Sequence, residues 1–325
     1  MERYRRTRRR VLASGFAVGI GGLAGCSGST DDTTEDEEGT ESSVEPVVSI
    51  PGEPVPENMA FDSEGNLLFG ITDGELRRLP QEQLGESDLT LDDTEQVASL
   101  PEVIGVETGP DDTVYVTVPT DDEQGGVWEV PPDSDPSQLV SIGGFPNDIV
   151  VDSSRDRLLV TESFGGVVYA VDITDGAQAI DGERRSTWLD DDRLDTDGFG
   201  ANGITRDGNA IYIAVTQAPN DSGRLLRASI ADDGSASETT LFAEGSELAG
   251  ADGIDAADGA VYVAANSLNR VVRVADSGEP LTVATGDDGL VFPSDVEFGP
   301  DGEWLYICNF ANQSPEEAAI LRTQV

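Results

Sequence analysis

Six stretches of the sequence follow one template, in which a short strand, a turn containing Gly or Asp and a second, apolar strand are followed by a third strand. The stretches recur at intervals of roughly 40 to 55 residues, and a repeat of about this length predicts a radial array of similar units. Equivalent positions of such an array face one axis. The residue just before the first strand is, in chain order, Glu57, Ile104, Asn147, Asn202, Asp252 and Ser294. We therefore expect these six residues to surround one small space.

The second strand of each unit is short, rich in β-branched and aromatic residues, and bounded by turn residues, which is typical of buried β-strands. These strands are predicted over Leu67–Thr72, Val114–Val118, Arg157–Glu162, Ala210–Thr216, Ala260–Ala265 and Trp304–Asn309. A sandwich of two sheets does not explain six repeats of similar length. The sequence predicts an all-β fold, a six-bladed β-propeller of four-stranded blades.

The sixth unit has only three predicted strands before the chain ends. The segment Val44–Ile50 has the pattern of a strand but belongs to no unit. We expect this N-terminal strand to complete the last blade, because that pairing closes the ring and removes open sheet edges. Cys308 falls within an apolar strand of the same blade and is predicted to be a core residue.

The first part of the chain has the features of an export signal. Residues 1–10 are rich in Arg, and the run Thr7-Arg8-Arg9-Arg10 resembles a twin-arginine motif. An apolar segment of roughly 15 residues follows, which is too short to span a bilayer and fits the apolar region of a signal peptide. It ends in Leu23-Ala24-Gly25-Cys26, which resembles the lipidation motif of lipoproteins.

These features divide the chain into a signal peptide over 1–25, an acidic disordered tether over 26–45 and a propeller over 46–325. We expect an exported, monomeric lipoprotein that is anchored to the membrane through Cys26 and faces the cell exterior. An incidental cysteine or an uncleaved anchor is the alternative interpretation of Cys26.

The charge of the chain limits both its partners and its chemistry. It has 64 Asp and Glu against 19 basic residues, a net charge of −45, and no His. Such a charge excludes nucleic acid as a partner. Because the acidic residues are spread along the chain, a surface adapted to high salt is favoured over a patch for a cationic ligand. Without His, a Ser-His-Asp triad and a His-ligated zinc site are excluded, so a metal would need oxygen ligands.

Four of the six positions that share the axis can supply such ligands. Glu57, Asn147, Asn202 and Asp252 together offer two carboxylates and two amides, which form an oxygen cage for Ca²⁺, with Mg²⁺ or Mn²⁺ as alternatives. The same residue types are common turn formers before strands. Their shared register in the repeat favours a metal site over four unrelated turns.

Four short motifs carry a resemblance to a known family: Pro56-Glu57-Asn58, Pro146-Asn147-Asp148, Asn202-Gly203 and Asp252-Gly253. They are similar to motifs of the six-bladed propellers of the regucalcin (senescence marker protein), gluconolactonase and luciferin-regenerating enzyme superfamily, over about residues 46–325. The resemblance implies a divalent metal held by Glu57, Asn202 and Asp252, with Asn147 adding to the metal or substrate shell. It also implies metal-dependent hydrolysis of a lactone or related ester, with Asp252 acting as general base or as ligand toward the attacking water.

One position departs from that family. Its sugar lactonases carry an Arg two residues before the Asn of the third blade, and here that position is Phe145. Together with Ile104 this makes the mouth of the channel more apolar, so we expect a small-molecule lactone or ester less polar than a sugar lactone. Asn147, Phe145, Ile104 and Ser294 are the candidate substrate contacts, although Ser294 also suits a turn. The alternative function is a non-catalytic, surface-anchored propeller that binds a ligand or a protein.

Overall fold

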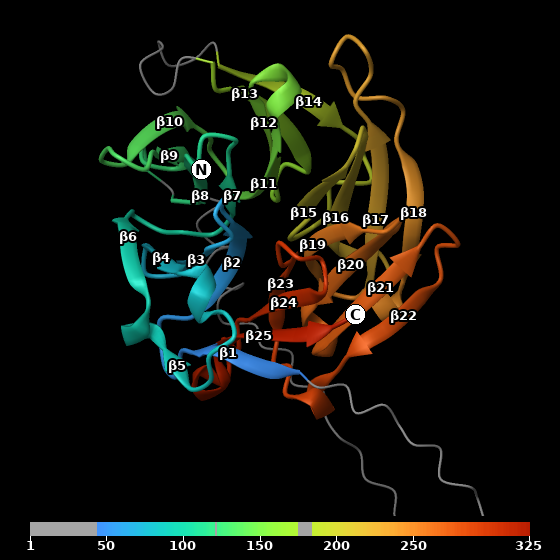
Figure 1. Ribbon diagram of the computed structural model, residues 1–325. Coiled ribbons are helices and arrows are strands. Elements are labelled where there is room, and N and C mark those ends of the chain that lie inside the picture. The colour runs from blue at the N-terminus through green and yellow to red at the C-terminus, as the bar shows by residue number, and fades with distance from the viewer. Residues whose placement is uncertain (1–43, 121, 175–183) are drawn as a thin grey trace, which may run out of the picture. The chain divides into compact units, whose positions relative to one another are not determined.

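Each of the six repeats folds into an antiparallel sheet, and the sheets stand as blades around a common axis in the computed structural model (Figure 1). The structure describes residues 44–120, 122–174 and 184–325. The fold is the predicted six-bladed β-propeller with four strands in each blade. The helical segments among the described residues are short 3-10 turns: η1 (Gln81–Gln83), η2 (Leu91–Asp93), η3 (Ser153–Arg155), η5 (Ser246–Leu248), η6 (Asn266–Leu268), η7 (Gly286–Asp288) and η8 (Pro315–Glu317).

The strands of each blade follow one another from the axis outward. Blade one contains β2 (Pro56–Phe61), β3 (Leu67–Ile71), β4 (Glu75–Leu79) and β6 (Glu95–Ser99). Blade two contains β7 (Val106–Thr108), β8 (Val114–Val118), β9 (Gly126–Val130) and β10 (Ser137–Ser141). Blade three contains β11 (Pro146–Asp152), β12 (Arg157–Glu162), β13 (Val167–Asp172) and β14 (Arg185–Asp190).

The remaining blades repeat this order. Blade four contains β15 (Ala201–Asp207), β16 (Ala210–Ala218), β17 (Ser222–Ser229) and β18 (Thr240–Gly245). Blade five contains β19 (Ala251–Ala257), β20 (Ala260–Ala265), β21 (Arg270–Ala275) and β22 (Pro280–Ala284). Blade six contains β23 (Pro293–Phe298), β24 (Trp304–Asn309), β25 (Ala319–Gln324) and the N-terminal strand β1 (Glu45–Ser49).

Six large apolar clusters of the described core lie one between each pair of adjacent blades, and a smaller cluster contains Val55, Ala311 and Ala318. Side chains alternate between the two faces of a strand, so each middle strand contributes to two clusters. On β12, Leu159 packs toward blade four, whereas Leu158 and Val160 pack toward blade two. This arrangement explains why the second strands are almost continuously apolar, and it brings the first strands into mutual contact all around the axis.

The ring is closed as predicted, by pairing of the N-terminal strand with the C-terminal one. β1 lies antiparallel to β25, with Val48 opposite Ile320, and the two strands run side by side in Figure 1. Arg322 adds a hydrogen bond from Nε to Glu45 Oε1 of 2.7 Å across the same pair. A further strand that was not predicted, β5 (Leu89–Thr90), pairs in parallel with β1 and covers the outer edge of the blade. Cys308 is fully buried in β24, as predicted.

The predicted signal peptide over 1–25, Cys26 and nearly all of the tether over 26–45 lie outside the described residues. The first strand begins at Glu45, the last residue of the predicted tether. Among the residues that the structure describes, no helix has the length and apolar character needed to cross a bilayer.

The closure of the ring can be tested at Val48, which is fully buried in the cluster between blades six and one. We expect Val48→Ala to lower the free energy of unfolding by about 2 kcal/mol, because it leaves a cavity where the two chain ends meet. Val97→Ala is the matched control, since Val97 lies on the outer strand β6 and is 38% exposed. Denaturant unfolding of both variants measures the difference, and equal stability would contradict closure by β1.

Candidate functional site

A β-bulge marks the point in the repeat where the sequence placed the candidate residues. It occurs in five of the described first strands, β2, β11, β15, β19 and β23. In β11, Pro146 lies opposite Glu162 and Ile149 opposite Val160, so the two intervening residues face a single residue of β12. A bulge of this kind bends the strand and redirects its side chains.

The bulges correct one detail of the sequence analysis. Glu57, Asn147, Asn202, Asp252 and Ser294 were predicted to lie just before the first strands, but they lie within them. The reason is that each strand resumes its pairing on the far side of the bulge. Ile104 alone precedes its strand, β7, and its N–H donates to the carbonyl of Thr117 at 3.1 Å.

All six equivalent positions line one small cavity on the axis, although they come from six different blades. Its lining residues are Glu57, Asn58, Ile104, Asn147, Asp148, Asn202, Asp252, Gly253 and Ser294. The cavity volume is about 10 Å³, which is of the order needed for one water-sized particle. The space therefore has room for an ion and is too small for an organic molecule.

The amide groups in this ring are held by hydroxyls on the second strand or directly after it. Asn147 Nδ2 donates to Ser163 Oγ at 3.0 Å, and Asn202 Nδ2 donates to Thr216 Oγ1 at 2.7 Å. These hydrogen bonds fix the amide planes and leave the amide oxygens available as ligands. Oriented carbonyl oxygens of this kind are what a hard cation such as Ca²⁺ binds.

Two carboxylates complete the ring, and both are strongly perturbed. Burial raises the pKa of Glu57 well above its ordinary value, and repulsion from Asp252 and Glu102 raises it further. Burial also raises the pKa of Asp252 to about 7, against the opposing effect of hydrogen bonds from Asn266 and Asn202. Glu57 Oε2 is buried without a hydrogen-bond partner among the described residues. A buried acceptor beside a second carboxylate is costly unless a cation lies between them.

The donor set fits a divalent cation, but only as a mixed set of carboxylates and amides. Within 44–120, 122–174 and 184–325, no three Asp, Glu, Cys or His side chains come together in a way that could hold a metal ion. Asn147 and Asn202 would therefore have to contribute alongside Glu57 and Asp252. Ser294 contributes differently, because its hydroxyl donates to the carbonyl of Glu57 at 2.6 Å and links blade six to blade one.

In β2, β11 and β23 the residue after the candidate position was not predicted as functional, and its side chain joins adjacent blades. Asn58 Oδ1 accepts from the N–H of Val106 at 2.8 Å, and Asp148 Oδ2 accepts from the N–H of Ile204 at 2.8 Å. Asp295 Oδ2 accepts from the N–H of Met59 at 3.0 Å, which spans the closure of the ring. The sequence signal was that this position holds Asn or Asp in three repeats (Asn58, Asp148 and Asp295) and Gly in the other three (Gly105, Gly203 and Gly253).

Those glycines are required by close approach of the next blade. A Cβ at Gly203 would lie 2.3 Å from the carbonyl oxygen of Asp252, and one at Gly253 would lie 2.1 Å from Asp295 Oδ1. Contacts this short exclude any side chain. The Asn-Gly and Asp-Gly motifs thus combine a candidate ligand with the residue that allows two blades to meet.

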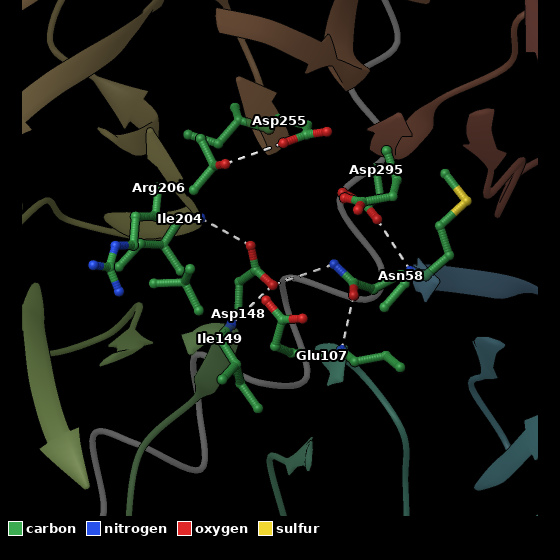
Figure 2. A pocket seen from close by; sticks show the side chains of 15 residues that line it. Asn58, Glu107, Asp148, Ile149, Ile204, Arg206, Asp255 and Asp295 are labelled. Carbon is green, nitrogen blue, oxygen red and sulfur yellow. Dashed lines mark hydrogen bonds between the residues drawn. The ribbon is translucent and has the colours of Figure 1, made fainter. Parts of the chain in front are cut away.

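A second, larger cavity of about 170 Å³ is lined by residues further along the first strands. Five carboxylates line it: Glu107, Asp148, Asp255, Asp295 and Glu297. In Figure 2 the carboxylates of Glu107 and Asp148 lie close together, whereas the guanidinium of Arg206 points away from them. Arg206 Nη1 instead donates to Asp152 Oδ1 at 3.0 Å. These five carboxylates were not predicted, because the expected site was drawn from a single position of each repeat.

Burial is the largest influence on the pKa values of the carboxylates in the larger cavity. It raises the pKa of Glu107 to about 8 and that of Asp148 to about 7, in each case against opposing hydrogen bonds to backbone N–H groups. The pKa values of Asp295 and Glu297 are also raised well above normal, by burial and then by repulsion from neighbouring carboxylates. The axis therefore carries an electrostatic cost when all its carboxylates are ionised.

Phe145 does not line the small cavity, unlike the other candidate substrate contacts. Its ring packs instead against Phe164 and Phe199, with centroid distances of 5.5 Å and 5.1 Å. These two partners were not predicted. Phe199 shortly precedes Asn202 in the sequence, and Phe164 follows Ser163, whose hydroxyl accepts a hydrogen bond from Asn147.

Comparison with known proteins supports the fold and shows no family. The sequence matches no protein-family model and no curated protein. Among solved structures, a gluconolactonase from Xanthomonas campestris is similar with a TM-score of 0.64 and 14% identity, over 88% of this chain and 90% of that chain. An auxiliary nutrient-binding protein from Bacteroides thetaiotaomicron has a TM-score of 0.65 and 11% identity, over 86% and 75%. At such identities the similarity shows a shared fold.

A third similar structure is the PQQ-bound aldose sugar dehydrogenase from Streptomyces coelicolor, with a TM-score of 0.61 and 14% identity over 87% of this chain and 98% of that chain. A lactonase, a binding protein and a dehydrogenase thus share the propeller. The function of this chain has to be argued from its own site.

The pKa of Glu107 predicts how stability depends on pH. A carboxyl whose pKa is higher in the folded state than in the unfolded state stabilises the fold at pH values below the unfolded-state pKa. This contribution is lost as the pH rises through the folded-state pKa. We expect Glu107→Gln to raise the free energy of unfolding by about 2 kcal/mol at pH 8 and by less than about 0.5 kcal/mol at pH 4.5, relative to wild type. Gln keeps an oxygen for the N–H of Thr108.

Urea unfolding at constant salt, with a chelator present, measures this effect. Glu86→Gln is the control, because it removes the same charge from an exposed position. Equal curves for Glu107→Gln and wild type across this pH range would show that the channel carboxylate is not perturbed.

Proposed function

We propose that the protein binds a divalent cation, preferentially Ca²⁺, between Glu57, Asn147, Asn202 and Asp252, and uses it to hydrolyse a lactone or related ester. The proposal depends most on one observation. Four oxygen-bearing side chains from four blades surround a cavity the size of an ion, and the buried Glu57 Oε2 has no hydrogen-bond partner among the described residues. A cation would satisfy this oxygen and remove the repulsion between Glu57 and Asp252.

The residues suggest how such a reaction would be arranged. A divalent cation at this point would polarise an ester carbonyl held at the channel mouth. Asn266 Nδ2 donates to Asp252 Oδ2 at 2.7 Å and so orients this carboxylate. Asp252 would accept a proton from the attacking water as the water oxygen forms a bond to the carbonyl carbon. The proton would return to the leaving alkoxide when the ring C–O bond breaks, which gives a hydroxy acid.

Asn147 and Asn202 would keep the cation and the carbonyl in register, because both amides are fixed by hydroxyls behind them. None of these steps requires His, which the chain lacks. A binding protein without turnover is the rival function, consistent with the nutrient-binding protein among the structurally similar proteins.

A panel of lactones and esters tests the proposed reaction directly. In high salt with Ca²⁺, we expect turnover that is abolished by EDTA and falls at least about a hundredfold in Asp252→Asn, since loss of a general base typically costs 10²–10⁴ in rate. Thermal unfolding of Asp252→Asn checks that the variant is folded. Turnover that survives EDTA, or Ca²⁺ binding without turnover on any substrate, would reject the hydrolase.

Binding of the cation has its own test, which does not depend on turnover. A saturating ligand stabilises the folded state, by about 2.7 kcal/mol at a hundredfold excess over Kd. We expect Ca²⁺ to raise the unfolding temperature of wild type and of the exposed-charge control Glu86→Gln, and to have much less effect on Glu57→Gln. Equal shifts in all three proteins would place the cation elsewhere.

We further propose that the chain is exported and anchored through a lipid on Cys26, on the basis of its Arg-rich start, apolar segment and Leu23-Ala24-Gly25-Cys26 motif. The excess of acidic residues favours a protein adapted to a saline environment. At 1 M salt the Debye length is about 3 Å, so repulsion between the acidic side chains is largely screened.

A further inference from the structure

Three phenylalanines form a cluster at the end of the channel where the candidate ligands lie. Phe145 directly precedes β11, and Phe199 precedes β15 by two residues. Phe164 lies in the hairpin between β12 and β13, which opens at the same end because Pro146 at the start of β11 pairs with Glu162 at the end of β12. The rings of Phe164 and Phe199 lie 5.2 Å apart, and all three side chains remain partly exposed.

The loops that carry these rings are fixed by hydrogen bonds to the side chains of Glu162 and Gln217. The buried carboxylate of Glu162 accepts the N–H of Phe145 at 2.7 Å and the N–H of Phe164 at 3.0 Å with one oxygen. Its other oxygen accepts the N–H of Gly165 at 2.7 Å. Phe199 N–H donates to Gln217 Oε1 at 3.1 Å, and Gln217 N–H donates back to the carbonyl of Phe199 at 3.0 Å. The aromatic surface is therefore held in place before any ligand binds.

The same framework positions the candidate ligands. The hydroxyl of Ser163 accepts from Asn147 Nδ2 at 3.0 Å and donates to the carbonyl of Ala201 at 2.6 Å, next to Asn202. The N–H of Ser163 donates to the carbonyl of Phe145 at 3.0 Å. A group bound on the rings would thus lie beside the two amides of the proposed cation site.

The size of the axial cavity decides what these rings can contact. At about 10 Å³ it has room for an ion, so the body of a substrate must remain at the mouth. The aromatic cluster supplies fixed apolar surface there, and burying apolar groups against it is favourable by about 25 cal/mol per Å². Phenylalanine offers no hydrogen bonds to sugar hydroxyls, which would be left unpaired against it.

We propose that Phe145, Phe164 and Phe199 form an apolar subsite that binds the alkyl or aryl substituent of the lactone or ester. This inference rests on the proposed function and defines its substrate class: lactones and esters with an apolar side chain, in preference to polyhydroxylated sugar lactones. The three residues contact the substituent and determine specificity, while the reacting ester group lies over Asn147 and Asn202.

A series of lactones with unbranched side chains of increasing length tests the subsite. We expect kcat/KM of the wild type to rise about threefold for each added methylene that reaches the rings, and to be lowest for gluconolactone. In Phe199→Ala the increase of kcat/KM with chain length should be largely lost, while kcat/KM for the shortest lactone should change less than about threefold. Phe199→Leu should restore part of the increase. Phe242→Ala, which removes a partly exposed ring packed on Tyr212 at 5.0 Å, is the matched control.

Calorimetry with the corresponding lactams, which resist hydrolysis, separates the subsite from the reaction. If lactam affinity rises with chain length in wild type and in Phe199→Leu but not in Phe199→Ala, the subsite is supported even where no lactone is turned over. If lactones are hydrolysed with the same chain-length dependence in wild type and Phe199→Ala, the subsite is wrong and the hydrolase stands. A preference for gluconolactone over the alkyl series would also overturn it.

Discussion

Adjacent blades meet at the axis through hydrogen bonds from backbone N–H groups to side chains at the bulges of the first strands. Asn58, Asp148 and Asp295 accept these bonds, and glycines in the other blades allow the neighbouring backbone to approach. The bulge that provides each acceptor also turns the preceding residue toward the axis. Each candidate ligand at a bulge is thus followed directly in the chain by the residue that contacts the next blade.

This shared construction concentrates negative charge on the axis. Glu57 and Asp252 lie at the small cavity, and five further carboxylates line the larger one. Burial raises the pKa values of these groups, so their ionisation opposes folding, while the six apolar clusters between blades favour it. Cations from a saline solution, or one cation bound at a defined point, would stabilise such an axis. We propose the small cavity as the defined site, because there two fixed amides accompany the carboxylates.

Much of the fold followed from the sequence, because six repeats with apolar second strands allow few arrangements. The register of Glu57, Asn147, Asn202 and Asp252 also brought together the residues that the structure places around one cavity. What the sequence concealed depends on departures from regular strands. Period-two alternation gives no reason for two successive bulge residues to face the axis, so Asp148 and Asp295 were missed. Phe164 and Phe199 were missed because only the tertiary structure brings their loops to Phe145. Cation binding, hydrolysis and lipidation at Cys26 stay predictions.

The central claim is that one divalent cation is held where the six first strands begin. Anomalous diffraction from crystals grown in high salt with Mn²⁺, recorded on both sides of the manganese absorption edge, tests it most directly. The account predicts a single strong anomalous peak between the carboxylates of Glu57 and Asp252, within ligand distance of the oxygens of Asn147 and Asn202. An empty position there, or a peak only among the carboxylates of the larger cavity, would contradict it.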